Sequence, residues 1–151
     1  MLKEERGFSL AEALVATGIM AFALVGILCT YTTCLVLINT SKNVNAATNA
    51  AQGIIEEIRS TPFTQIMPNY NGMLFTVNDV PSSIGVVYIN NSTAPASADL
   101  MLATVSICWR QGNKTIGEDV NLNGVLDAGE DLNGNGIIDS TVQLKTMVVR
   151  R

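Results

Sequence analysis

The sequence contains no histidine and only three cysteines among its 151 residues. The lack of histidine excludes Ser-His and Cys-His nucleophilic catalysis and histidine-ligated zinc, and three cysteines cannot build a dense disulfide framework. Charged residues are scarce, at 15% against about 25% in typical soluble domains. The 9 basic residues are outnumbered by 13 acidic ones, so no clustered basic face for nucleic acid is indicated. These shortages favour a membrane-linked protein that is not an enzyme.

The hydrophobic residues, which make up 48% of the chain, are concentrated in one run near its start. Residues 13–38 form 26 consecutive positions without a charge, more than the roughly 20 that a helix needs to cross a bilayer. A cleaved secretory signal is the main alternative, but the run is too long and no small-x-small cleavage site follows it. The sequence therefore predicts a retained membrane helix over residues 8–38.

The helical pattern continues beyond the membrane segment, over residues 39–61. Apolar residues recur there at intervals of three or four, which is typical of one face of a helix; they are Val44, Ala47, Ala51, Ile54, Ile55 and Ile58. Pro62 ends the pattern, because a residue before proline avoids the helical region. We therefore expect one helix from Phe8 to Thr61, amphipathic in its second half.

The rest of the chain, residues 62–151, reads as a head built from short strands. Strands are expected at 72–77, 85–89, 100–109 and 141–149, separated by turn-forming residues. In the last strand apolar and polar residues alternate, which predicts an antiparallel sheet with one covered face. The expected fold class is α+β, with the long N-terminal helix packed against a C-terminal antiparallel sheet. Cys108 is expected to be a small core residue.

The residues ahead of the apolar run carry a specific motif. The segment Gly7-Phe8-Ser9-Leu10-Ala11-Glu12 resembles the processing site of type IV prepilins and pseudopilins. The resemblance implies that prepilin peptidase removes leader residues 1–7 by cutting between Gly7 and Phe8, and that Phe8 is then N-methylated. It also implies that Glu12 meets the N-terminal amine of a neighbouring subunit, since in hydrocarbon an ammonium and a carboxylate each need a partner. The alternative is that Glu12 simply reaches the membrane interface.

Looser similarities extend through the chain. Residues 51–63, 105–109 and 144–146 are similar to segments of PilV-type minor pilins. The resemblance implies a pilin-like fold in a subunit that waits in the bacterial inner membrane and then joins a pilus or pseudopilus, with its head periplasmic or extracellular. Implied partners are other pilins or pseudopilins, prepilin peptidase and the inner-membrane assembly platform. No nucleic acid and no small-molecule substrate are expected. A minor pseudopilin of a type II secretion system or a competence pseudopilus remains the alternative.

Residues 117–139 carry a second motif, which matches the EF-hand calcium loop D-x-[DN]-x-[DN]-G-x₅-E. The expected ligands of the first loop are Asp119, Asn121, Asn123, the Val125 carbonyl, Asp127 and Glu130, with Gly124 at the turn. Twelve residues on, the pattern recurs with Asp131, Asn133, Asn135 and Asp139. Val142 occupies the twelfth position of this second loop, so the sequence predicts one complete site and one weaker site.

The charge of this segment favours a cation. Six of the 13 acidic residues lie between Glu118 and Asp139, with no basic residue among them, so without a cation we expect an extended loop. Ca²⁺ suits a site with many oxygen ligands better than Mg²⁺ does. Strands rather than helices are expected on both sides, as in the helix-free calcium loops of extracellular repeat proteins. A solvated turn rich in Asn, Asp and Gly is the alternative.

Overall fold

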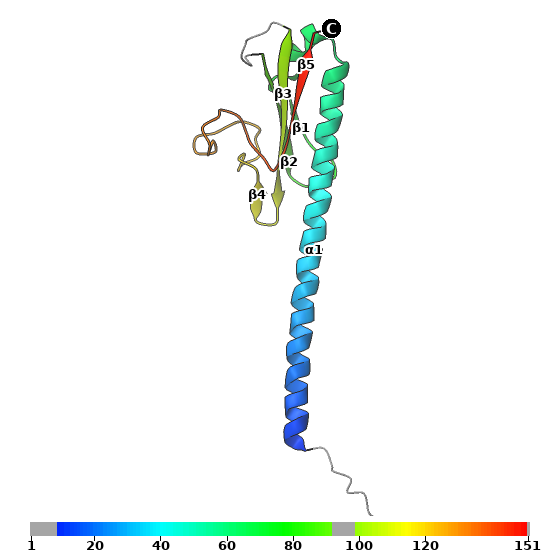
Figure 1. Cartoon of the computed structure of the whole chain (residues 1–151). Helices are drawn as coiled ribbons and strands as arrows, with labels where there is room; N and C mark the ends of the chain where they lie inside the picture. Colours follow the sequence, from blue (N-terminus) through cyan, green and yellow to red (C-terminus); the bar gives the residue numbers. More distant parts are fainter. Residues whose placement is uncertain (1–8, 92–98, 151) are drawn as a thin grey trace, which may run out of the picture. The chain divides into compact units, whose positions relative to one another are not determined.

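The computed structural model describes residues 9–91 and 99–150 as two helices and a five-stranded antiparallel sheet (Figure 1). Its elements are α1 (Leu10–Ser60), α2 (Phe63–Tyr70), β1 (Leu74–Phe75), β2 (Ser83–Asn90), β3 (Leu100–Gln111), β4 (Lys114–Ile116) and β5 (Val142–Val149). The chain divides into two units, the first ending at Asn39 and the second beginning at Thr40, and α1 contributes to both. The α+β class, with a long apolar N-terminal helix and a C-terminal antiparallel sheet, is confirmed.

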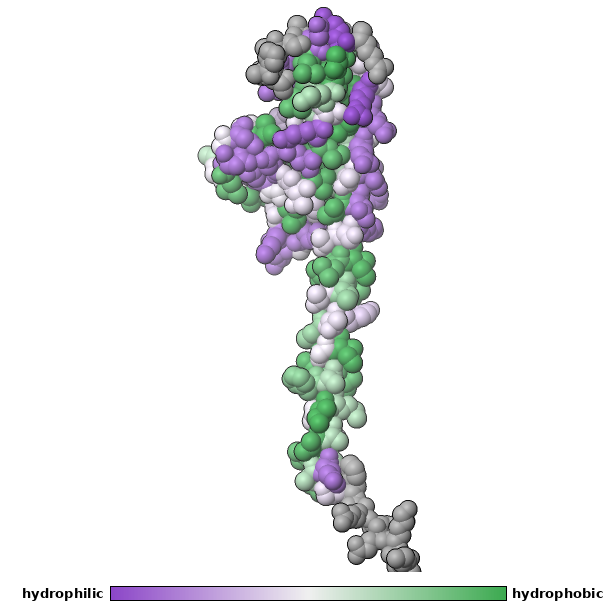
Figure 2. Space-filling view, in the orientation of Figure 1, coloured by the Kyte–Doolittle hydropathy of each residue, from purple (hydrophilic) through white to green (hydrophobic). Residues whose placement is uncertain are grey.

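The part of α1 that lies in the first unit is apolar and uncovered. Its side chains up to Ile38 are almost all exposed, and its surface is hydrophobic in Figure 2. Among the residues that the structure describes, α1 is the one helix long and apolar enough to cross a membrane, judged by length and composition. A signal sequence or a soluble core helix can pass the same test, but a core helix would be buried and this stretch is not.

The part of α1 that lies in the second unit forms the core of the head. Ala47, Ala51, Ile55 and Ile58 are buried, as the three-and-four spacing predicts, while the opposite side is exposed. Burial of one large side chain such as that of Ile58 contributes about 1.5–3 kcal/mol, so this stripe holds α1 on the sheet.

Helix α2 is absent from the sequence prediction, which places only strands after Pro62. Pro68 lies inside this eight-residue helix and removes one helical hydrogen bond. Burial of Ile66 and Tyr70 offsets that loss, and the Tyr70 hydroxyl donates a hydrogen bond of 2.9 Å to Glu57 Oε1 on α1. The spacing of Phe63, Ile66 and Tyr70 is the signal that could have revealed the helix.

Strand β3 is the centre of the sheet. One edge pairs with β2 over its whole length, from Ser83 opposite Trp109 to Asn90 opposite Leu102. The other edge is shared by two strands: β4, with Ile116 opposite Trp109, and β5, with Val142 opposite Ile107. Strands β4 and β5 run in the same direction along this edge, so the chain between them is an insertion into one arm of a hairpin.

The four expected strands are present, with different bounds. The predicted strand at 72–77 is reduced to β1, Leu74–Phe75, and the predicted strand at 85–89 begins earlier, at Ser83. β4 is absent from the prediction because a strand of three residues shows no periodicity. The turn-forming pair Gly112-Asn113, between Gln111 and Lys114, was its only sequence signal. Most of the connection between the expected strands at 85–89 and 100–109 lies outside the described residues.

The helices cover the first face of the sheet, and the inserted segment covers part of the second. The expectation of a single covered face holds along β5, where Lys145, Met147 and Val149 are exposed, and is wrong for β2 and β3. The first face packs on α1 and α2 and contains Val87, Val105 and Trp109. The second face carries a smaller cluster of Val86 and Cys108, and the inserted segment covers it. The covering side chains are Leu122, Leu126 and Ile138, of which Ile138 is fully buried. The predicted core position of Cys108 is confirmed, since it is 1% exposed.

Candidate functional site

The candidate site is the inserted segment between β4 and β5, whose two ends are joined at the sheet edge. The backbone N–H of Glu118 donates to the Asp139 carbonyl at 2.8 Å, and the Asp139 N–H donates to Glu118 Oε2 at 3.0 Å. The Ser140 hydroxyl donates to the Ile107 carbonyl of β3 at 2.5 Å. The segment is therefore a closed loop with a fixed base, bordered by strands as the sequence predicts.

The first repeat, residues 119–130, is turned around the carboxylate of Asp119. This side chain is fully buried, and its two oxygens accept the backbone N–H groups of Asn123 at 3.2 Å and Gly124 at 2.7 Å. The side-chain oxygen of Asn121 also accepts the Asn123 N–H, at 2.9 Å. Gly124 has φ of 79°, which side chains other than glycine rarely adopt. The motif residues thus make the tight turn that the sequence predicts.

The second repeat, residues 131–142, reproduces this geometry twelve residues on. Asp131 Oδ1 accepts the N–H groups of Gly134 and Asn135, and Asp131 Oδ2 accepts that of Gly136 at 3.0 Å. Asn133 accepts the Asn135 N–H at 3.0 Å, as Asn121 does for Asn123. Gly136 has φ of 76°, close to the value at Gly124. The two repeats are therefore structural as well as sequence repeats.

In each repeat the aspartate at the ninth position accepts hydrogen bonds from two side-chain amides. In the first repeat Asp127 Oδ2 accepts the Nδ2 groups of Asn121 and Asn123 at 2.7 and 2.9 Å. Each asparagine therefore uses its oxygen for the backbone and its nitrogen for the carboxylate. The first, third, fifth and ninth positions of the motif are brought together by hydrogen bonds alone.

Asp139 takes the corresponding place in the second repeat, where Asn133 and Asn135 donate to its Oδ2. Burial raises the pKa of Asp139, but the hydrogen bonds from Asn133, Gln143 and Asn135 outweigh burial and, with the nearby charge of Lys145, lower the pKa below its ordinary value. The carboxylate is accordingly held in its charged form.

The repeats differ at their twelfth positions. Glu130, 8% exposed, accepts the N–H groups of Val120 at 2.9 Å and Asn121 at 3.4 Å on one oxygen, and that of Asp127 at 3.1 Å on the other. It therefore joins the start of its repeat to the end. The second repeat has Val142 at this position, and that side chain is buried in the main core. Only the first repeat has a terminal carboxylate.

The donor set fits a hard divalent cation in chemical type, because every expected ligand atom is an oxygen. Within the described part of the chain, neither Asp119 nor Glu130 forms an ion pair, although both are buried. In this conformation, however, no three acidic or cysteine side chains of the described residues are gathered closely enough to hold a metal ion. The loop is also compact rather than extended, because its carboxylates are satisfied by N–H groups.

The predicted processing site is only partly described. Gly7 and Phe8 lie outside the described residues, and Glu12 lies in the first turn of α1. The Glu12 carboxylate accepts the Ser9 N–H at 3.0 Å, and the Ser9 hydroxyl accepts the Glu12 N–H at 3.2 Å. This reciprocal pair is a capping box. The capping role of Ser9 is absent from the sequence prediction, although Ser-x-x-Glu is a recognisable capping signal.

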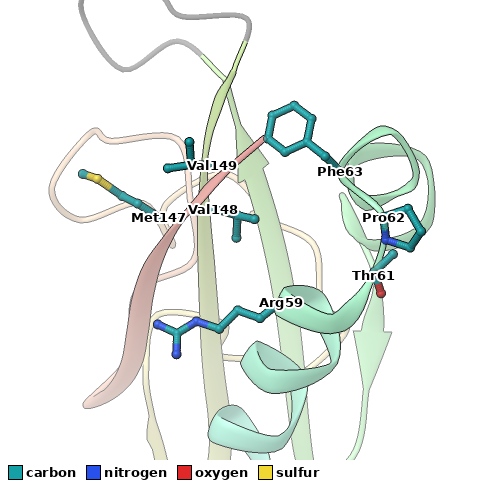
Figure 3. A pocket seen from close by; sticks show the side chains of 7 residues that line it. All are labelled: Arg59, Thr61, Pro62, Phe63, Met147, Val148 and Val149. Atoms are coloured by element: carbon teal, nitrogen blue, oxygen red, sulfur yellow. The ribbon is translucent and has the colours of Figure 1, made fainter. Parts of the chain in front are cut away.

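An open groove of about 630 Å³ lies elsewhere in the head, between the end of α1, the start of α2 and β5 (Figure 3). It is lined by Arg59, Thr61, Pro62, Phe63, Met147, Val148 and Val149. The one charged side chain of this lining, Arg59, extends toward β5 and donates two hydrogen bonds to Thr146 Oγ1, at 2.6 and 3.2 Å. The lining contains no pair of groups suited to acid–base or nucleophilic chemistry.

In comparisons with protein-family models, with curated proteins and with solved structures, nothing matches this chain.

Proposed function

We propose that this protein is a structural and assembly subunit, a minor pilin-like protein of a type IV pilus. Prepilin peptidase would remove its leader after Gly7, and the mature chain would enter the filament through α1. A minor pseudopilin of a type II secretion system or competence pseudopilus is the alternative. The observation that carries the proposal is the long, uncharged and uncovered stretch of α1 that begins immediately after Glu12.

This stretch needs an apolar environment. Of the 21 large hydrophobic side chains that are exposed in the described residues, 15 lie between Leu10 and Ile38. An apolar surface of this extent marks a contact with lipid or with other apolar surfaces. A subunit that first resides in a bilayer and then packs among other apolar helices satisfies the requirement at both stages.

The proposed assembly contact uses Glu12. In the isolated subunit the carboxylate caps its own helix by accepting the Ser9 N–H. Within the described residues it forms no ion pair. The N-terminal amine of a neighbouring subunit would supply a cation in a medium where each charge alone is costly. The capping box would be exchanged for an ion pair during assembly.

We further propose that the head binds Ca²⁺ at the first repeat, and a second ion more weakly at the second repeat. Asp119, Asn121, Asn123, Asp127, Glu130 and the Val125 carbonyl would hold the first ion, and Asp131, Asn133, Asn135 and Asp139 would contribute to the second. When bound, Ca²⁺ would supply positive charge to the buried carboxylates of Asp119 and Glu130, which form no ion pair within the described residues. Because Leu122 and Leu126 cover the second face of the sheet, a tighter loop would stabilise the head.

The proposed processing is tested by the intact mass and the N-terminal peptide of the protein purified from its native membrane. A mature chain that begins at N-methylated Phe8 is expected. A chain that still begins at Met1 in cells with an active prepilin peptidase would overturn the pilin proposal. Crosslinking of the mature chain to its filament neighbours then separates a pilus subunit from a secretion pseudopilin.

A further inference from the structure

The turn between β3 and β4 lies beside the first residues of α1 in the second unit (Figure 1). Gln111, the last residue of β3, joins the two. Its Nε2 donates to Thr40 Oγ1 at 2.5 Å, and its Oε1 accepts the Asn43 side-chain amide at 3.5 Å. The same oxygen accepts the indole N–H of Trp109 at 3.1 Å. These hydrogen bonds hold the turn beside Thr40–Asn43. We call residues 110–114 together with Thr40–Asn43 the hairpin end of the head.

Three basic side chains are exposed at the hairpin end: Lys42 on α1, Arg110 on β3 and Lys114 on β4. Within residues 9–91 and 99–150, none of the three forms an ion pair. One acidic residue, Asp79, lies in the neighbouring loop, whose Ser82 carbonyl accepts the Arg110 N–H at 3.1 Å. With Asp79 counted, the hairpin end keeps a net positive charge in a chain whose net charge is −4.

The hairpin end is also the part of the head that directly follows the uncharged run. Ile38 is the last large apolar residue of that run, and Lys42 follows it by four positions, or about 6 Å of helix. If residues 13–38 span a bilayer, Lys42 emerges at the depth of the lipid headgroups. Gln111 holds the turn beside Thr40 and Asn43, the neighbours of Lys42 in the sequence. The inserted segment, which carries six acidic residues, begins at the end of β4 opposite this turn (Figure 1), where the Thr115 hydroxyl donates to the Val120 carbonyl at 3.2 Å.

We propose that Lys42, Arg110 and Lys114 bind the headgroups of anionic phospholipids, so that the hairpin end of the head is docked on the bilayer from which α1 emerges. This inference rests on the membrane span of the proposed function. Each basic side chain near an anionic surface strengthens association by about fivefold, and three together by roughly a hundredfold. Docking would hold the head at the membrane until the subunit is withdrawn into a filament.

The chain contains a single tryptophan, Trp109, which lies next to the hairpin end. Its fluorescence therefore reports how close the hairpin end is to lipid. The full-length protein is reconstituted into phosphatidylglycerol vesicles and into phosphatidylcholine vesicles, both with the same share of lipid that carries a nitroxide on its headgroup. We expect strong quenching of Trp109 fluorescence in phosphatidylglycerol only, and its loss at about 0.5 M NaCl, where the screening length is a few ångströms.

Matched single variants test the assignment. Lys114→Gln is expected to lower the docking equilibrium about fivefold, and the triple variant K42Q/R110Q/K114Q to abolish quenching. Lys145→Gln removes an equally exposed charge on β5 and is expected to leave quenching unchanged. Equal quenching in the two vesicles, or an equal effect of Lys114→Gln and Lys145→Gln, would overturn the inference.

Two further readouts separate the possible failures. A chain that alkaline carbonate extracts from the vesicles overturns the membrane span and this inference together. A chain that stays in the vesicles but shows no lipid-dependent quenching overturns the inference alone. Inorganic phosphate should reduce quenching no more than NaCl of equal ionic strength; a larger reduction would indicate a discrete phosphate site and refute docking on the bilayer.

Discussion

Replacement of Asp119 by asparagine tests the proposed calcium site at its most buried ligand. Asp119 is fully buried, and each of its oxygens accepts a backbone N–H. Asparagine keeps one acceptor oxygen but places an NH₂ group against the other N–H. An unsatisfied buried donor costs about 1–3 kcal/mol, and removal of a buried charge recovers part of this. In the presence of a chelator we therefore expect Asp119→Asn to destabilise the head by about 1–2 kcal/mol.

Calcium should enlarge this difference. Extracellular calcium modules bind with dissociation constants of about 10⁻⁴–10⁻³ M. At a constant of about 10⁻⁴ M, 2 mM Ca²⁺ stabilises the folded state by about 1.8 kcal/mol, or close to 8 °C in Tm for a unit of this size. Calcium should raise the Tm of the wild-type protein by this amount. It should raise the Tm of Asp119→Asn by much less.

The assay is thermal unfolding of the full chain in detergent, followed by Trp109 fluorescence with and without calcium. Asp131→Asn is the matched control, because Asp131 makes the same kind of hydrogen bonds in a repeat that lacks the terminal carboxylate. It should lose less of the calcium increment. A wild-type Tm that is identical with calcium and with chelator would refute the calcium site. An increment that survives Asp119→Asn would refute its assignment to the first repeat.

Three further predictions concern the helix and the core. Glu12→Gln removes the charge but preserves the capping box, which accepts Glu or Gln. The variant should therefore insert into the membrane normally but fail to enter filaments. Normal incorporation would show that Glu12 acts only as a helix cap. Ile58→Ala should destabilise the head by about 2–5 kcal/mol in chemical denaturation, against less than about 0.5 kcal/mol for the exposed Gln52→Ala. Burial raises the pKa of the Cys108 thiol, so maleimide should label Cys108 at pH 8 only after unfolding. The free energy of unfolding should also fall as pH rises above about 8.5. Because Cys29 and Cys34 are exposed, the label is located by peptide mapping, and rapid labelling of Cys108 itself in the folded chain would contradict its burial.

The long elements could be predicted because their periodicity extends over many residues. The buried stripe from Ala47 to Ile58 and the alternation along β5 each repeat several times, so single exceptions do not hide them. Helix α2 and strand β4 are short, and Pro68 obscures the helical spacing of Phe63–Tyr70. Their formation depends on contacts with α1 and β3, which sequence periodicity does not reveal.

The candidate loops could be predicted for a related reason. Except for the bonds from Val120 and Asn121 to Glu130, which span ten and nine positions, their hydrogen bonds join residues no more than six positions apart within each repeat. The motif, which includes Glu130, therefore contains almost all the information that shapes them. The closure between Glu118 and Asp139 spans 21 positions and has no local signal. The same applies to Ile138, which reads as an ordinary loop residue but is buried on the second face of the sheet.

Because β4 and β5 lie end to end on the same edge of β3, residues 117–141 form a module that can be exchanged. A short linker from Ile116 to Val142 would leave one uninterrupted hairpin arm with the same register. Such a replacement would also expose Val86 and Cys108, so any substitute needs its own apolar residues. Surface diversity among proteins built on this plan can therefore arise at one insertion point, provided that each inserted segment brings apolar side chains that cover the sheet.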